Sequence, residues 1–207
     1  LLQSSAASDV YKRQSRRRSL VNVSFKSILV FIWPFLFFSG TIFALPQKAP
    51  EFDLQSPQGK LSLNQLRGQV VLIFFGFTAC PDVCPISLST ISRVFHQMEE
   101  EEQQKSKALF ITLDPERDKV EMMQEYTGFF HSNIIGLTDT EETISEVAQS
   151  YGVNYQKKKL ERSALGYVIN HTADIYLVDS SGMLVKRYPH DVDPEVLVAK
   201  IRNLLVH

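Results

Sequence analysis

The stretch QVVLIFFGFTACPDVCP, residues 69–85, decides the fold and contains the candidate site. Residues 69–75, QVVLIFF, are dominated by β-branched and aromatic side chains, which is typical of a central strand buried on both faces. The chain's only two cysteines, Cys80 and Cys84, follow directly after this run. A Cys-x-x-x-Cys pair at this place fits a redox couple, a structural disulfide or a metal clamp.

The rest of the chain alternates between strand patterns and helix patterns. Strands are predicted over 69–75, 108–113, 134–137, 174–179 and 183–188, and helices over 85–102, 120–130, 140–151 and 194–206. Strands and helices alternate in the first part of this order, and a pair of strands that form a hairpin comes near its end. This order predicts an α/β fold, in which a mixed central sheet carries helices on both faces. This is the thioredoxin-like arrangement. The charge run at 156–162 is predicted to be a solvated loop.

The N-terminal part of the sequence differs in character from the rest. Residues 1–27 are basic and show no periodicity, so we expect them to be disordered or foreign to the natural chain. Residues 28–45 carry no charge, which predicts a transmembrane or signal-anchor helix; a signal cleaved after Ala44 is the alternative. Residues 46–59 are predicted to be a tether that leads into a domain over residues 60–207.

The distribution of charge places the domain and excludes one class of partner. Basic residues precede the apolar run, so the positive-inside rule puts the domain on the non-cytoplasmic side of the membrane. Residues 46–207 carry 16 Lys/Arg against 22 Asp/Glu. A mildly acidic body without a basic stripe is a poor nucleic-acid binder, so no nucleic-acid partner is expected.

The sequence also predicts where the helix after the cysteines begins. Pro85 lacks the N–H that an interior helical position needs, so we expect the helix to start at Pro85 and residues 80–84 to form a tight loop. Both sulfurs then face the positive end of the helix dipole. That position favours thiolates, the form that binds metals and attacks disulfides.

The spacing of the cysteines favours a metal site. Redox helices usually use Cys-x-x-Cys, whereas three intervening residues let both sulfurs point at a common third point. Two thiolates alone do not complete a transition-metal site, and imidazole is the usual partner for copper. Four of the five histidines are expected at the surface. These are His96, His131, His190 and His207.

His171 differs from the other histidines by its place in the predicted fold. It stands just before the strand predicted at 174–179, in the loop that faces the cysteine loop in a thioredoxin-like fold. Ordinary members carry a proline there, and this chain has none between Asn170 and Val178. A histidine, which can bind a metal, thus stands in place of the proline that normally shields a sulfur. His171 is therefore predicted to be the third ligand.

The motifs around these residues resemble those of a known family. Over about residues 50–206, the chain is similar to the Sco/SenC proteins, membrane-tethered copper chaperones of cytochrome c oxidase assembly. The Cys-x-x-x-Cys motif with the downstream histidine is specific, whereas a lone Cys-x-x-x-Cys is not. The matching motifs are Gly76-Phe77-Thr78, Cys80-Pro81-Asp82-Val83-Cys84-Pro85, TLDPERD at 112–118, Gly136-Leu137-Thr138, His171-Thr172 and Tyr176-Leu177-Val178-Asp179.

The resemblance implies a thioredoxin-like fold that binds one copper per chain, as Cu(I) or Cu(II), through Cys80, Cys84 and His171. It implies delivery of copper to the dinuclear site of cytochrome c oxidase subunit II. Reduction of that site's cysteines is a second implied activity, in which Cys80 and Cys84 are the redox-active, catalytic residues. Another copper chaperone or a thiol reductant is a further expected partner.

The expected location follows from the predicted anchor and the resemblance together. We expect the domain to lie in the bacterial periplasm, anchored to the inner membrane. The alternative is the mitochondrial inner membrane, with the domain facing the intermembrane space.

Some positions depart from the family's usual pattern, although none is a predicted ligand. Asn170 stands where the family often has Asp, and this change would weaken a contact that orients His171. The other departures are Lys119-Val120 in place of Thr-Pro and Asp139 in place of Gly.

Two acidic residues follow the second predicted strand, where α/β sites collect. Asp114 and Asp118 are predicted to support the metal site or to dock a partner. The alternative for Asp118 is a capping role at the start of the helix from Val120.

Other functions stay open from the residues alone. A thiol–disulfide oxidoreductase without copper would need Cys80 and Cys84 but not His171. A thiol peroxidase would need Thr and Arg beside its cysteine, and only Thr78 is obviously in place. A structural disulfide across a five-residue loop would contribute little stability, and zinc normally takes four ligands in a closed site.

Overall fold

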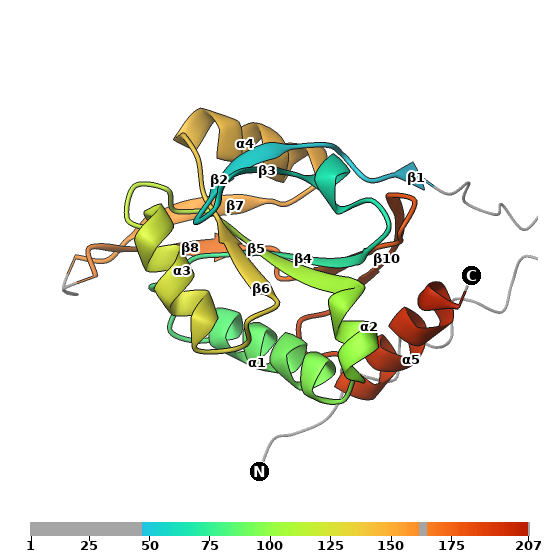
Figure 1. The fold of residues 1–207 in the computed structure, drawn as a ribbon. Helices are drawn as coiled ribbons and strands as arrows, with labels where there is room; N and C mark the ends of the chain where they lie inside the picture. Colours follow the sequence, from blue (N-terminus) through green and yellow to red (C-terminus); the bar gives the residue numbers. More distant parts are fainter. Residues whose placement is uncertain (1–46, 162–164, 207) are drawn as a thin grey trace, which may run out of the picture. The chain divides into compact units, whose positions relative to one another are not determined.

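The computed structural model describes residues 47–161 and 165–206, which form a central sheet covered by helices (Figure 1). The six strands lie in the order β1-β10-β9-β4-β5-β6. β4 is parallel to β5, and β5 to β6, whereas β9, β10 and β1 join as antiparallel neighbours. The predicted mixed sheet is confirmed. The bounds are β1 Gln47–Lys48, β4 Val70–Gly76, β5 Ser106–Thr112, β6 Ile134–Leu137, β9 Ile175–Val178 and β10 Met183–Tyr188.

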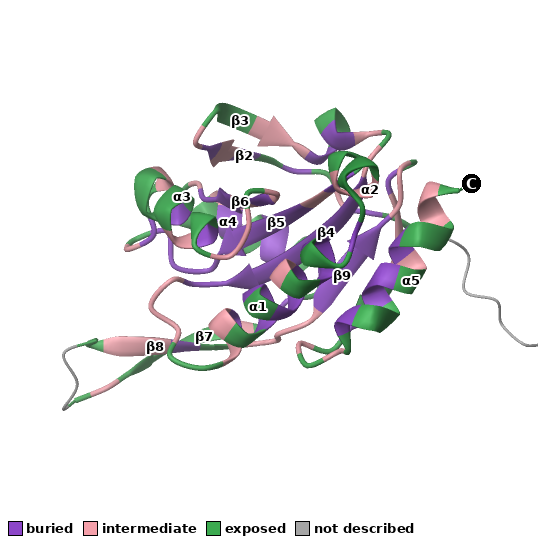
Figure 2. Ribbon diagram, turned by 60° about the horizontal axis from the view of Figure 1, so that its bottom comes forward, coloured by how far each residue is buried: buried purple, intermediate pink, exposed green. Residues whose placement is uncertain are grey.

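The central strand of this sheet is buried along its whole length (Figure 2). All seven residues of β4 are buried. β5 and β9 flank the strand on either side, so its side chains project only toward the two covered faces. The continuous apolar run predicted this placement, and the strand ends just before the cysteine pair.

Helices cover both faces of the sheet, as predicted. On one face Phe74 stacks on Phe110, and Tyr126 of α3 packs against Phe110. On the other face Phe75 contacts Tyr151 at the end of α4. Figure 1 shows α1 and α5 on one side of the sheet and α4 on the other. The bounds are α1 Val83–His96, α2 Glu100–Gln104, α3 Val120–Gly128, α4 Glu141–Ser150 and α5 Pro194–Leu205.

The helix after the cysteines begins earlier than the sequence predicts. α1 starts at Val83 with Asp82 as its N-cap residue, so Cys84 lies inside the first turn. The expected start at Pro85 is wrong. The first four N–H groups of a helix have no intrahelical partner, so a proline fits anywhere in the first turn.

The same helix also ends earlier than predicted. α1 stops at His96, and α2 is a separate short helix. The Glu99 N–H donates to the Glu102 carboxylate at 2.8 Å. This local bond starts a new helix inside the acidic stretch that the sequence assigned to the first one.

Two small hairpins lie outside the six-stranded sheet. β2 (Asp53–Ser56) pairs with β3 (Gly59–Ser62), within and just after the segment predicted to be a tether. β7 (Tyr155–Lys159) pairs with β8 (Tyr167–His171). The predicted solvated loop at 156–162 is therefore wrong in part, because most of it is a strand, although its side chains are exposed.

The predicted anchor over residues 28–45 and the basic segment before it lie outside the described residues. Within residues 47–161 and 165–206, no helix has both the length and the apolar character needed to cross a membrane.

Candidate metal centre

The two cysteines stand at the junction of the central strand and the first helix. After β4, the Cys80 N–H donates to the Phe77 carbonyl at 3.2 Å and closes a turn. Cys84 follows in the first turn of α1 and is fully buried, whereas Cys80 is partly exposed. Both are free thiols. One sulfur therefore belongs to the core and the other lies at its surface.

Gly76, the last residue of β4, makes room for the buried sulfur. A Cβ atom at this position would lie 2.7 Å from Cys84 Sγ and 2.8 Å from the Phe110 ring. Side-chain carbons do not approach their neighbours this closely, so any larger residue would displace the sulfur or the ring.

His171 ends β8 and reaches the cysteines from the other side. Its Nε2 lies 3.6 Å from Cys84 Sγ, and its Nδ1 lies 2.9 Å from the Thr172 carbonyl. An Nδ1–H that donates to this carbonyl leaves the Nε2 lone pair directed at the sulfurs. Phe74 and Phe77 flank the ring, with centroids 6.3 and 6.1 Å from its own.

The donor atoms of Cys80, Cys84 and His171 all lie within 4.8 Å of one another. The fold thus brings together the three residues that the sequence singled out. A cavity of about 310 Å³ opens beside them, lined by residues of the cysteine turn and of β8. In the described part of the chain, no other group of His, Cys, Asp and Glu side chains converges in this way.

The two thiols have opposite electrostatic environments. A hydrogen bond with Cys84 lowers the pKa of Cys80 to about 4 against the opposing effect of burial, and His171 adds a further hydrogen bond. The same Cys80–Cys84 hydrogen bond, together with burial, raises the pKa of Cys84. Without a metal, the pair therefore shares one proton, and the negative charge lies on the more exposed sulfur. A bound metal ion displaces that proton, because a coordinating thiol is deprotonated.

Asp118 holds the turn that leads to the cysteines. Its buried carboxylate accepts hydrogen bonds from the Thr78 N–H at 3.0 Å, the Thr78 hydroxyl at 2.5 Å and the Thr112 hydroxyl at 2.6 Å. Burial raises the pKa of Asp118, although these hydrogen bonds favour the charged form. The alternative of a cap is wrong, because Lys119 is the N-cap residue of α3.

Asp114 holds the strand that carries the histidine. Its buried carboxylate accepts a hydrogen bond from the Tyr167 hydroxyl at 2.7 Å and pairs with Arg117, whose guanidinium lies over the Tyr167 ring. Tyr167 begins β8, and His171 ends it. Sequence reasoning missed Thr78 as a partner of Asp118, and it missed Tyr167, because partners so distant in sequence leave no local signal.

Asn170 and the remaining histidines lie apart from the three donors. Asn170 is exposed on β8, and a backbone carbonyl rather than its side chain contacts the imidazole. His96 and His131 pair with each other, with ring centroids 5.1 Å apart. His190 lies in the turn before α5, and His207 is outside the described residues.

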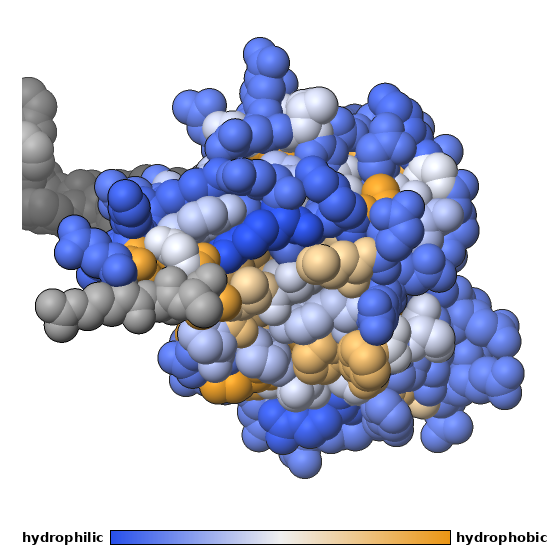
Figure 3. All heavy atoms as spheres, turned by 90° about the vertical axis from the view of Figure 1, so that its left-hand side faces the viewer, coloured by the Kyte–Doolittle hydropathy of each residue, from blue (hydrophilic) through white to orange (hydrophobic). Residues whose placement is uncertain are grey.

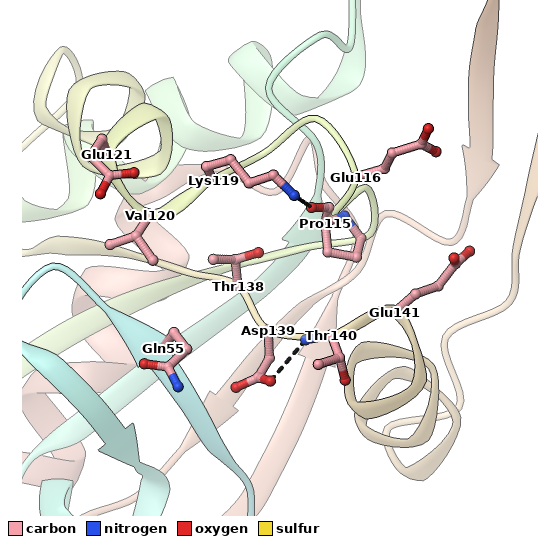
Figure 4. A pocket seen from close by; sticks show the side chains of 10 residues that line it. All are labelled: Gln55, Pro115, Glu116, Lys119, Val120, Glu121, Thr138, Asp139, Thr140 and Glu141. Carbon is pink, nitrogen blue, oxygen red and sulfur yellow. Dashed lines mark hydrogen bonds between the residues drawn. The ribbon is translucent and has the colours of Figure 1, made fainter.

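A larger hollow lies among β2, β6, α3 and α4 (Figure 4). Its volume is about 770 Å³. The Lys119 ammonium donates to the Pro115 carbonyl at 2.7 Å, and the Asp139 carboxylate accepts from the Thr140 N–H at 2.8 Å. The lining contains carboxylates but neither a thiol nor an imidazole, so it lacks the soft donors of the cysteine site. The lining residues are Gln55, Pro115, Glu116, Lys119, Val120, Glu121, Thr138, Asp139, Thr140 and Glu141.

The fold and the site together define a class: a thioredoxin-like domain with a Cys-Cys-His donor set that is consistent with one bound copper. The family model described as SCO1/SenC matches residues 44–206. The chain therefore belongs to the SCO1/SenC family.

Individual relatives agree with this assignment. The SCO2-like protein of Rickettsia prowazekii is 34% identical over 155 residues, which cover 73% of this chain and 74% of the relative. The mitochondrial SCO2 homolog of Bos taurus is 36% identical over 155 residues, covering 74% of this chain and 58% of the relative. Both relatives carry the SCO2 name, and the second is mitochondrial.

A solved structure supports the fold and the metal. Bradyrhizobium japonicum ScoI with copper bound is 36% identical, has a TM-score of 0.69, and the match covers 76% of this chain and 99% of that chain. Nearly all of that solved chain aligns with the domain, so the aligned region makes up a whole solved chain in the relative.

Proposed function

We propose that this protein is a membrane-tethered copper metallochaperone. It holds one copper through Cys80, Cys84 and His171 and delivers it to the dinuclear copper site of cytochrome c oxidase subunit II. The observation that carries the proposal is the convergence of three soft and borderline donors within 4.8 Å, beside an open cavity. The delivery target comes from the family resemblance.

The chemistry of the donors suits a cargo metal. Two thiolates and one imidazole favour copper, and Cu(I) accepts low coordination numbers with soft ligands. Partly exposed Cys80 and His171 leave the ion accessible to an acceptor's ligands, while buried Cys84 keeps hold of it. Delivery then proceeds by exchange of ligands without a change in oxidation state.

The tether and the location rest on the sequence. A helix over residues 28–45 would anchor the domain on the non-cytoplasmic side of the membrane. In a bacterium this side is the periplasm, where subunit II presents its copper site; the mitochondrial intermembrane space is the equivalent compartment.

An anaerobic titration of Cu(I) into the reduced domain, residues 46–207, tests the proposal against a competing chelator. We expect one copper per chain. His171→Ala should weaken binding by more than about tenfold, the loss that follows even when only a hydrogen bond behind a ligand is removed. His96→Ala, which alters an exposed histidine of α1, is the matched control. Equal binding by the His171→Ala and parent proteins would rule out His171 as a ligand.

A second candidate function is thiol–disulfide exchange on the same acceptor. The observation that favours it is the low pKa of Cys80 beside a protonated Cys84, the asymmetry that a dithiol needs to attack a disulfide and then resolve it. Reduction of an oxidised acceptor peptide should then require both cysteines and tolerate His171→Ala. Loss of reduction in the His171 variant would instead tie the activity to the metal site.

A further inference from the structure

One methionine of α3 stands apart from its neighbours. Met122 lies in the first turn of the helix and is 47% exposed, whereas Met123 beside it is fully buried. A Cβ at Gly136 would meet Met123 within 2.7 Å, so Met123 fills the contact between α3 and β6. The packing of the helix against β6 therefore explains Met123 but does not explain why a methionine stands at the exposed position 122.

The Met122 thioether contacts the turn that carries the cysteines. Its Sδ lies 3.6 Å from the Thr78 hydroxyl, and Thr78 precedes Cys80 by two residues. The turn between them is tight, because the Cys80 N–H donates to the Phe77 carbonyl. Asp118, two residues before α3, fixes Thr78 by two hydrogen bonds and thereby fixes the distance from this helix to the turn.

A second contact places the same face of α3 beside the other cysteine. Tyr126 lies one turn after Met122, and its ring centroid is 5.8 Å from that of Phe110. Phe110 and Cys84 Sγ both border the position where a Cβ of Gly76 would stand. Met122 therefore contacts the turn that leads to Cys80, and Tyr126 on the same face of α3 packs against the ring that borders Cys84.

Part of the surface around this face of α3 is apolar (Figure 3). Figure 3 looks at the domain from the side of α3 and the β7–β8 hairpin, and shows apolar side chains gathered within an otherwise hydrophilic face. Exposed Met122 of α3 and exposed Ile86 of α1 belong to the two helices that adjoin the cysteines. The exposed thioether of Met122 is accessible to copper.

We propose, building on the copper delivery proposed above, that Met122 is an auxiliary ligand which holds Cu(I) together with the two cysteines while the ion passes to its acceptor. Thioethers are soft ligands that select Cu(I), and the three rotatable bonds of methionine let the sulfur swing toward Cys80. During delivery a Cu–S bond to Met122 forms and the Cu–N bond to His171 breaks. Copper stays Cu(I), and this exchange of one ligand for another moves no proton or electron. The acceptor's ligands then displace Met122 and finally the sulfurs of Cys80 and Cys84, and the freed cysteine pair takes back from solvent the proton that copper had displaced.

Copper-edge X-ray absorption on Cu(I)-loaded, selenomethionine-labelled domain gives a direct test. His171→Ala empties the imidazole position, so the auxiliary ligand should occupy it and give a Cu–Se scattering path. The path should vanish in His171→Ala/Met122→Leu and persist in His171→Ala/Met183→Leu, which changes a methionine of β10. Absence of a Cu–Se path in the single variant, or its survival after Met122→Leu, would overturn the inference.

The copper content of the parent protein separates this inference from the proposed function. A parent domain that binds no Cu(I) overturns both. A parent that binds one Cu(I), together with a His171 variant that shows no Cu–Se path, overturns only the role of Met122.

Transfer kinetics distinguish a ligand from an apolar contact. With His171 intact, Met122→Leu keeps the size and apolar character of the side chain but lacks sulfur. We expect Cu(I) transfer to a chromogenic chelator to slow by about tenfold in Met122→Leu and Met122→Ala alike, the scale seen when groups around a metal are altered. Equilibrium affinity should stay unchanged, because Met122 is not a ligand before transfer. An unchanged rate of Cu(I) transfer by Met122→Leu would show that Met122 is only a surface residue and would overturn the proposal.

Discussion

The metal centre has two halves that are built differently. The cysteine half belongs to the core: Cys84 is fully buried, and the turn before it bonds to buried Asp118. The histidine half lies on the β7–β8 hairpin, outside the six-stranded sheet, where His171 is partly exposed. Asp114 ties that hairpin to the body through Tyr167.

Both attachments start from the same short loop between β5 and α3. The Asp118 N–H donates to the Asp114 carbonyl at 2.9 Å, so a backbone hydrogen bond within this loop links the two residues. Folding of the core therefore fixes the sulfurs, whereas the imidazole depends on a hairpin with few buried side chains. Such a hairpin opens at a lower free-energy cost than the core. The imidazole is therefore the more readily exchanged of the three donors.

Asp118→Ala should break the cysteine half and have the largest effect. It removes the acceptor of three hydrogen bonds at a buried site and leaves the Thr78 N–H unpaired. We expect the free energy of unfolding of the reduced domain to fall by about 3 kcal/mol, measured with urea. A loss well under about 1 kcal/mol would contradict the assigned role.

Asp118→Asn separates the charge of this group from its shape. Because burial raises the pKa of Asp118, the folded protein binds the proton more tightly than the unfolded chain. The stability of the wild-type protein therefore falls as pH rises from 3.8, the ordinary pKa of an aspartate, through the higher pKa of Asp118 in the folded protein. Asn lacks this dependence, so the deficit of the variant should be larger at about pH 4 than at about pH 7. A stability deficit that grows toward neutral pH would mean that folding lowers the pKa of Asp118 instead of raising it.

Gly76→Ala perturbs the same half from the strand. The added carbon would displace Cys84 Sγ or the Phe110 ring, so we expect a loss of about 2 kcal/mol and weaker Cu(I) binding. Gly128→Ala is the control, because nothing lies within 4 Å of a Cβ at that end of α3. If the two variants unfold alike, close packing around the sulfur is not what requires glycine at position 76.

Tyr167→Phe loosens the histidine half alone. It deletes the hydroxyl that donates to Asp114 and should cost about 1 kcal/mol of stability. Copper transfer to a chelator should become faster, because His171 is held less firmly. Tyr155→Phe on the partner strand is the control, and stopped-flow absorbance gives the rate. Slower transfer by Tyr167→Phe would show that the hairpin does not limit release.

Asn170→Asp should have the smallest effect. The side chain is exposed, so a carboxylate there would stabilise copper bound at His171 by only about 0.5 kcal/mol. The gain in Cu(I) affinity should disappear at high salt, because exposed charges are screened. A gain that persists in high salt would mean that the carboxylate contacts the imidazole directly.

The sequence predicts the elements that face the core better than those that do not. The run at 69–75 and the helical spacing after Pro194 reflect burial, and the structure places them as β4 and α5. The sequence did not predict β7, because four of the five residues of Tyr155–Lys159 are polar and exposed. Only pairing with β8 makes this segment a strand. The start of α1 was predicted two residues too late, because a proline can occupy any position of a helix's first turn and does not identify the first residue.

The candidate site divides in the same way. Cys80, Cys84 and His171 are residue types with few alternative uses, so their pattern predicted the cluster that the structure brings together. The supporting contacts were not predictable. Asp118 reaches Thr78 across 40 positions and Asp114 reaches Tyr167 across 53, and neither pair leaves a trace in local sequence.

The separation of 87 positions between Cys84 and His171 has a consequence for synthesis. The two sulfurs leave the ribosome well before the imidazole, and β4 gains its neighbour β9 only after His171 has emerged. A growing chain therefore passes through a stage in which it has a dithiol but no complete site. Copper held by all three donors therefore requires a chain that has been synthesised past His171 and folded around the site, and a shorter chain cannot hold the ion in that form.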